Sequence, residues 1–300
     1  MKEHEILSII KNSIGSEFIG DDCAYLKDLN IVISQDSLVE DIHFKRKWCT
    51  PYQLGYKSVT VNISDILASG AKPLYISISL SLPNNINEEF IKDFYNGAKS
   101  ALNGSIIVGG DITGSSDKIF ISIAAIGSTA DRNISSRKNA KKGYYIITKG
   151  LYGSSAAGLN ELYTNNKNKE LIKAHLEPTV DFKFSQTVST IVKEEYAMMD
   201  TSDGLADALF KIAEASNVKI VVDYNKIARL PNIDKDKVLF GGEDYNLIAA
   251  IPEKYLKYFS DADIIGYADS YDGIYLDISG QVFSDYNEIK AYNHFGDING

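Results

Sequence analysis

The chain has 300 residues, of which 44% are hydrophobic, and it carries a formal net charge of −9 at pH 7. This length and composition allow a large core, divided between two domains, and the acidic balance argues against a nucleic-acid partner. Two cysteines, Cys23 and Cys49, exclude a disulfide framework and a Cys-based zinc site. Because no apolar run reaches the length of a membrane span or a secretory signal, we expect a cytoplasmic protein without a membrane partner.

The first half of the chain predicts alternating helices and strands. Thr50, Pro51 and Gln53 form a helix-capping pattern, and Gly70 is suited to end the helix that they begin. From Leu74 to Leu82 aliphatic and polar residues alternate without a break, which predicts a strand buried on one face. The other elements expected here are helices over 3–12 and 87–104, and strands over 29–34, 105–108 and 119–126.

The polar and basic stretch from Thr129 to Lys142 is the best linker candidate. The second half is expected to contain strands over 144–149, 219–223 and 245–251, helices near 153–163, 168–175 and 181–195, a helix after Pro252, and short strands to the end. Because helices and strands alternate in both halves, the sequence indicates an α/β or α+β protein with two domains, 1–135 and 136–300.

A short apolar run ends at Asp200 and Asp203, immediately before a helix expected over 204–216. The plain structural interpretation is that Ser202 or Asp203 caps this helix. The same construction, a strand followed by small residues and an acid, recurs at Ser34-Gln35-Asp36, Gly109-Gly110-Asp111 and Gly241-Gly242-Glu243-Asp244. This recurrence favours a functional role over a cap alone.

Six carboxylates are expected at strand ends or helix starts: Asp22, Asp36, Asp65, Asp111, Asp200 and Asp203. Gathered in one cleft, they would repel one another unless cations lay between them. Oxygen ligands without His or Cys partners favour magnesium over zinc or copper, and magnesium commonly bridges carboxylates to phosphate. Glycine-rich turns let backbone N–H groups approach a phosphate, so the combination indicates a nucleotide site. Each acid taken alone could equally be a cap or a turn residue.

The common nucleotide and hydrolase motifs are missing from the sequence. The stretch from Gly109 to Ser115 has the glycine spacing of a P-loop, but Ser115 occupies the lysine position. Protein-kinase motifs, a dinucleotide fingerprint and a nucleophile elbow are not found. A phosphotransferase with this sequence would therefore lie outside the common folds.

Ten short segments carry a resemblance that covers the chain from about residue 15 to 295. They are Gly20-Asp21-Asp22-Cys23-Ala24, Ser34-Gln35-Asp36, Val39-Glu40 with His43-Phe44, Gly55-Tyr56-Lys57, Val61-Asn62-Ile63-Ser64-Asp65, Ala68-Ser69-Gly70-Ala71, Gly109-Gly110-Asp111, Ser202-Asp203-Gly204-Leu205, Gly241-Gly242-Glu243-Asp244-Tyr245 and Tyr292-Asn293-His294-Phe295. In this order they resemble the thiamine-monophosphate kinases and, more widely, the aminoimidazole ribonucleotide synthetase family.

The resemblance implies a two-domain fold in which the N-terminal sheet domain forms a homodimer and the C-terminal α/β domain completes the active site. It implies ATP- and magnesium-dependent transfer of the γ-phosphate onto thiamine monophosphate, giving thiamine diphosphate, with several magnesium ions bound. The metal ligands that it implies are Asp22, Ser34, Gln35, Asp36, Asp65, Asp111, Asp200 and Asp203. The implied ATP contacts are Gly110, Asp111, Arg137 and Ser202, and the implied substrate contacts are His43, Glu243 and Tyr292.

The sequence departs from the family pattern at Gln35 and Ile112, where threonine is usual, and at Gly114, where arginine is common. Arg137 or Lys149 could partly replace the missing cation. Because no side chain stands out as a phosphate-accepting nucleophile, we expect direct in-line transfer. Two alternatives stay open: another ATP-dependent synthetase of the same superfamily, and a non-catalytic protein that binds nucleotides or divalent cations.

Overall fold

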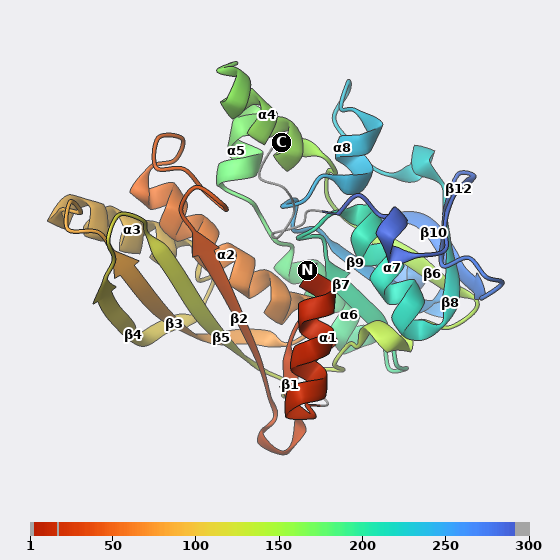
Figure 1. Ribbon diagram of the computed structural model, residues 1–300. Helices are drawn as coiled ribbons and strands as arrows, with labels where there is room; N and C mark the ends of the chain where they lie inside the picture. The colour runs from red at the N-terminus through yellow and green to blue at the C-terminus, as the bar shows by residue number, and fades with distance from the viewer. Residues whose placement is uncertain (1–2, 17, 292–300) are drawn as a thin grey trace.

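The computed structural model describes residues 3–16 and 18–291 (Figure 1). A five-stranded sheet occupies the first half of the chain, in the order β1-β2-β5-β3-β4. Only the β3–β4 pair of this sheet is parallel. Its strands are β1 (Ala24–Leu26), β2 (Ile31–Val39), β3 (Lys72–Leu82), β4 (Ile106–Gly114) and β5 (Phe120–Ser128).

Two helices, α2 (Pro51–Ala68) and α3 (Glu88–Ala101), cover one face of this sheet (Figure 1). The capping box predicted from Thr50 and Gln53 is present and starts α2. A first helix, α1 (Glu3–Ile14), precedes the sheet. Within the described part of the chain, no helix is long and apolar enough to cross a membrane.

The aliphatic face predicted for the strand over 74–82 is buried by the chain's own helices. Ile76, Ile78 and Leu80 of β3 are at most 1% exposed beneath α2 and α3. The opposite face of β3 carries the alternate residues Tyr75, Ser77, Ser79 and Ser81, and none of the described helices covers it (Figure 1).

A seven-stranded sheet occupies the second half of the chain, in the order β12-β11-β8-β10-β6-β9-β7. Its strands are β6 (Tyr144–Thr148), β7 (Ala197–Asp200), β8 (Val218–Val222), β9 (Leu247–Pro252), β10 (Asp263–Ser270), β11 (Leu276–Ile278) and β12 (Gln281–Phe283). The helices of this half are α4 (Ser154–Thr164), α5 (Lys169–Leu176), α6 (Phe182–Ile191), α7 (Leu205–Ser216) and α8 (Lys235–Phe240).

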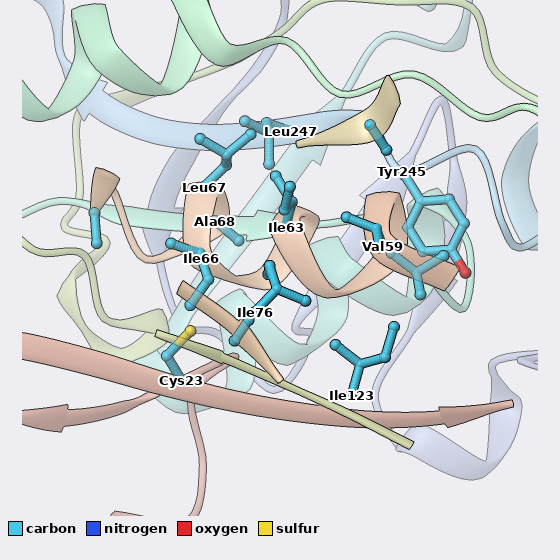
Figure 2. Packing of buried hydrophobic residues seen from close by; sticks show 14 of the residues in the cluster. Cys23, Val59, Ile63, Ile66, Leu67, Ala68, Ile76, Ile123, Tyr245 and Leu247 are labelled. Atoms are coloured by element: carbon cyan, nitrogen blue, oxygen red, sulfur yellow. The ribbon is translucent and has the colours of Figure 1, made fainter. Parts of the chain in front are cut away.

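The two halves share a core around α2 (Figure 2). Val59 and Ile63 of α2 pack against Ile76 and Ile123 of the first sheet, and the same cluster includes Leu247 of β9. Because side chains from both halves enclose it, α2 is buried along most of its length. The first sheet ends at residue 128 and the second begins at 144, so a division at residue 135 falls in the connection, although the core does not divide there.

Several elements differ from the sequence-based expectations. Asp36 lies within β2 rather than after it, because β2 stays paired with β5 as far as Val39. The expected turn at Gly109-Gly110-Asp111 is part of β4, paired in parallel with β3. Gly110 permits this close pairing, since a Cβ there would lie 1.6 Å from the Ile78 carbonyl oxygen. The helix expected after Pro252 is a 3-10 helix, and α8 was not predicted.

Candidate active site

Three carboxylates from distant segments meet between the two halves of the molecule. Asp22 precedes β1, Asp65 lies on α2 and Asp200 ends β7. One oxygen atom from each lies within 4.8 Å of the others. The Oγ of Ser64 donates a hydrogen bond of 2.5 Å to Asp200, and the Oγ of Ser34 donates one to Asp65. The structure thus brings together four of the predicted metal ligands.

The electrostatics of this cluster suit a divalent cation. Burial, and then the charges of Asp36, Asp200 and Asp22, raise the pKa of Asp65. Burial and the charge of Asp22 raise the pKa of Asp200 to about 7. Asp36 adds a further negative charge, and its backbone N–H donates to Asn62 Oδ1 at 3.1 Å. These acids repel one another when they are ionised, and the fold holds them close together. Bound magnesium would therefore reduce the electrostatic repulsion within the cluster.

Three predicted metal ligands lie outside the cluster. The Gln35 side chain is exposed and donates to Ser122 Oγ at 3.1 Å, on the sheet face turned away from α2. Asp111 is exposed on the edge strand β4, paired with Ser79. Strands in a sheet lie ~4.8 Å apart, so β4 is about 14 Å from the β2 strand of Asp36. One magnesium ion cannot bind Asp36 and Asp111 of the same chain directly in this arrangement.

The third of these ligands, Asp203, pairs with a lysine that the sequence did not single out. Lys211 Nζ of α7 lies 3.3 Å from Asp203 and 2.7 Å from Asp207. The hydroxyl of Tyr286 also donates to Asp207, at 2.7 Å. The predicted capping of α7 by Ser202 or Asp203 was wrong, because the N-cap is Gly204 and no side chain bonds to it. Asp203 is held by Lys211 instead.

Arg137, a predicted ATP contact, lies at the carboxylate cluster. Its Nη2 donates to Asp22 Oδ1 at 2.6 Å, and its backbone N–H donates to Asp21 Oδ1 at 2.7 Å. Ser136 Oγ donates to the second oxygen of Asp21 at 2.8 Å. These bonds fix the loop that carries Asp22. The predicted ATP contacts Gly110 and Asp111 are exposed on β4 and are not part of this arrangement.

The fourth predicted ATP contact, Ser202, lies where two loops are joined. Its carbonyl oxygen accepts a 2.7 Å hydrogen bond from the backbone N–H of Glu243. Thr201 Oγ1 donates to the carbonyl of Asn246 and accepts from its backbone N–H. A Cβ at Gly242 would lie 2.5 Å from the Ser202 carbonyl oxygen, so only glycine allows this approach. The loop that carries Glu243 is therefore tied to the loop that follows Asp200.

A cavity of about 640 Å³ extends from the carboxylates along two helices. One face of α2 lines it with residues at four-residue spacing, namely Gln53, Lys57, Val61 and Asp65. One face of α4 does the same with Ser155, Leu159 and Tyr163. Side chains four apart lie above one another on a helix, so each helix presents a continuous wall.

Glu243 lies in the middle of this cavity, within reach of both walls. Lys57 Nζ, on a residue only 3% exposed, lies 3.0 Å from its carboxylate. His175 Nδ1 lies 3.3 Å from it and 3.0 Å from Ser155 Oγ. Burial lowers the pKa of His175 to about 4, so this ring is neutral at pH 7. Burial, the largest single influence, would raise the pKa of Glu243, but Lys57, His175 and His43 together outweigh it and the pKa is lowered.

Of the other two predicted substrate contacts, His43 and Tyr292, only His43 lies within the described residues. His43 lines the cavity and accepts a 3.0 Å hydrogen bond from the Val39 backbone N–H at Nδ1. Tyr292 lies outside the described residues. Sequence reasoning missed Lys57 and His175. The spacing of Lys57, Val61 and Asp65 on an otherwise uncharged helix was a usable signal for Lys57, whereas nothing in the sequence marked His175.

Comparisons with known proteins identify the family of this chain. Residues 20–129 match the family model described as "AIR synthase related protein, N-terminal domain". The chain is 32% identical to the thiamine-monophosphate kinase of Aquifex aeolicus, with 98% of both chains covered. It is 34% identical to that of Bacillus subtilis, with 78% of this chain and 77% of the relative covered.

Solved structures agree with this assignment. AaThiL complexed with AMPPCP and TMP superposes with a TM-score of 0.88 at 29% identity, covering 98% of this chain and 97% of the other. The first half of the chain is thus similar to the N-terminal domain of the AIR synthase-related proteins, and the whole chain shares the fold of this solved structure. The chain belongs to the thiamine-monophosphate kinase family.

Proposed function

We propose that this protein transfers the γ-phosphate of ATP to thiamine monophosphate, forming thiamine diphosphate and ADP. The observation that carries the proposal is the order of groups along one cavity. A carboxylate cluster lies at one end, and the ionised Glu243 lies further along. Thiamine monophosphate carries a phosphate dianion at one end and a thiazolium cation further along, and the names of the relatives support the same substrate.

Asp22, Asp36, Asp65 and Asp200 are the residues that would hold several magnesium ions, together with the hydroxyl of Ser34. Magnesium supplies neutralisation of the charge on the donor and acceptor phosphates. Arg137 holds Asp22 in place, and Glu243 attracts the thiazolium ring. The acceptor is already an oxyanion, so the chain has only to position it and exclude water. Gln35, Asp111, Asp203, Gly110, Ser202, His43 and Tyr292 stay predicted contacts, and the cytoplasmic location stays a prediction.

The proposal is tested by incubating the protein with ATP, magnesium chloride and thiamine monophosphate, and separating the products by liquid chromatography. Thiamine diphosphate and ADP should appear in equal amounts. ADP formed without thiamine diphosphate would indicate another acceptor, and nucleotide binding without turnover would indicate a non-catalytic protein.

Magnesium should stabilise the protein in a pH-dependent way. The raised pKa values of Asp65 and Asp200 mean that the native state binds protons more tightly than the unfolded state. Without metal, the free energy of unfolding should therefore fall as the pH rises from about 4 through about 7. Magnesium binds the ionised carboxylates, so at pH 8 and 100-fold excess over its Kd each bound ion should raise Tm by about 4 °C. The rise should be smaller at pH 5.5. Thermal melts that do not change with magnesium at pH 8 would contradict the metal site.

We infer that the protein is a homodimer joined through the uncovered face of the first sheet. This face has polar residues at its centre, including Ser79, and exposed apolar residues near its ends, including Tyr75, Phe120 and Ile106, which are 42%, 41% and 54% exposed. Light scattering should give about twice the chain mass of 33.1 kDa. Ser79→Arg should yield a monomer, because it places a long side chain where the two sheets would have to approach, whereas Lys99→Glu on α3 should not. A monomeric wild-type protein, or a dimeric Ser79→Arg variant, would refute this.

A further inference from the structure

An aromatic pair closes the end of the cavity that lies farthest from the carboxylates. Trp48 precedes α2, and Tyr163 lies in the last turn of α4. Both line the cavity, and their ring centroids are 4.6 Å apart at an interplanar angle of 76°. The pair thus joins the two halves of the chain at this end of the cavity.

The two helical walls give the order of groups along the cavity. An α-helix rises ~1.5 Å per residue, so Lys57 lies about 12 Å from Asp65 along α2. Lys57 and Ser155 are at the same level, because Glu243 and His175 connect them. From Ser155, α4 continues for another ~12 Å to Tyr163. The cavity therefore passes from the acids to Glu243 and then to the aromatic pair.

The charges around the pair differ from those at Glu243. Lys45 Nζ lies 4.8 Å from the Trp48 ring centroid and 5.2 Å from that of Tyr163. Lys47 Nζ lies 5.3 Å from the Trp48 ring. Two ammonium groups disfavour a further cation at this end, and aromatic faces favour a flat, uncharged ring. Glu243 is the matching site for a cation.

We propose that Trp48 and Tyr163 form the binding site for the aminopyrimidine ring of the acceptor. This inference rests on the proposed function, and it adds the orientation and the specificity of the acceptor. The phosphate points to the carboxylates, the thiazolium lies at Glu243, and the neutral pyrimidine packs against the aromatic pair. In the reverse orientation the thiazolium, which is the middle group, would stay near Glu243, while the acceptor phosphate would lie beside Lys45 and Lys47. The phosphate would then be far from the carboxylates that would hold magnesium, so the transfer itself selects the first orientation.

The sequence provides a direct reporter, because Trp48 is the single tryptophan of the chain. With magnesium and a nonhydrolysable ATP analogue present, titration of the wild-type protein with thiamine monophosphate should quench tryptophan fluorescence to saturation. The phosphorylated hydroxyethylthiazole, which lacks the pyrimidine, should cause much less quenching. The nucleotide analogue alone should leave the emission unchanged, since it belongs at the other end. Saturable acceptor binding by calorimetry without any change in fluorescence would overturn the inference.

Variants separate recognition of the ring from simple packing between the two halves. Trp48→Ala should raise the KM for thiamine monophosphate about tenfold to a hundredfold, with little effect on the KM for ATP. Discrimination between thiamine monophosphate and the thiazole phosphate should fall by the same factor. Trp48→Phe should restore most of it. Tyr52→Ala, which removes an aromatic ring of α2 outside the cavity lining, is the matched control and should leave both constants unchanged.

The outcomes distinguish this inference from the proposed function. If the wild-type protein does not phosphorylate thiamine monophosphate, the proposed function fails. If it does, and Trp48→Ala keeps the wild-type discrimination between the two acceptors, the aromatic pair only joins the two halves and the inference fails. A lowered Tm for Trp48→Ala together with unchanged discrimination would lead to the same conclusion.

Discussion

Asp65→Asn is expected to lower turnover by about 100- to 1000-fold while making the metal-free protein more stable. Asn keeps the size of the side chain and removes a charge that lies at the centre of the carboxylate cluster. Loss of that charge weakens magnesium binding, and therefore the neutralisation of the transferred phosphate. It also removes the charge burial and repulsion that raise the pKa of Asp65, so the variant should melt at a higher temperature than the wild type at pH 8 without metal.

Steady-state kinetics and thermal melts measure the two effects on the same preparation. The magnesium-induced rise in Tm should largely disappear in Asp65→Asn. Asp28→Asn, an exposed acid of the same half, is the control and should behave as the wild type. Near-normal turnover of Asp65→Asn at ordinary magnesium would show that the cluster is not the metal site.

Glu243→Gln should raise the KM for thiamine monophosphate far more than the KM for ATP. The carboxylate is the ionised group that meets the acceptor's cation, and Gln keeps its shape without its charge. Truncating one partner of a buried charge pair typically costs ~2–5 kcal/mol, because the other charge is left unpaired. In Glu243→Gln the buried charge of Lys57 would be left unpaired, so this variant should also unfold at a lower temperature.

A double variant separates the two consequences. In Lys57→Met with Glu243→Gln neither charge is left unpaired, so stability should recover in part while the KM for thiamine monophosphate stays high. Glu253→Gln, an exposed acid, serves as the control and should alter neither constant. Equal increases in the two KM values for Glu243→Gln would mean that this carboxylate does not recognise the acceptor.

Local signals predicted much of the fold. The starts of α2 and α3 were predicted from residues close together in the chain. Thr50 and Asn87 each accept a hydrogen bond from a backbone N–H only three residues away, and the structure contains both bonds. The buried strand over 74–82 was predicted because its aliphatic and polar residues alternate with the two-residue period of a strand. The C-terminal ends of β2 and β4 were not predicted. Both strands continue through Asp36 and Asp111 because partner strands supply hydrogen bonds there.

The candidate site was predictable as a set of residue types and less so as an arrangement. Composition identified the acids, and the structure gathers Asp22, Asp65 and Asp200, but no local rule says that Asp111 lies on a distant edge strand. The partner of Glu243 was missed for the same reason. Lys57 is 186 residues away in the chain, and their contact depends on how α2 packs against the second half.

We expect phosphate to pass directly from ATP to an acceptor held along one cavity. A single turnover with γ-labelled ATP, magnesium and an excess of enzyme, quenched at short times, tests it most directly. The label should remain in ATP until thiamine monophosphate is added, and should then appear in thiamine diphosphate at the rate at which it leaves ATP. Label on the protein before the acceptor is added, or in inorganic phosphate instead of thiamine diphosphate, would contradict the account.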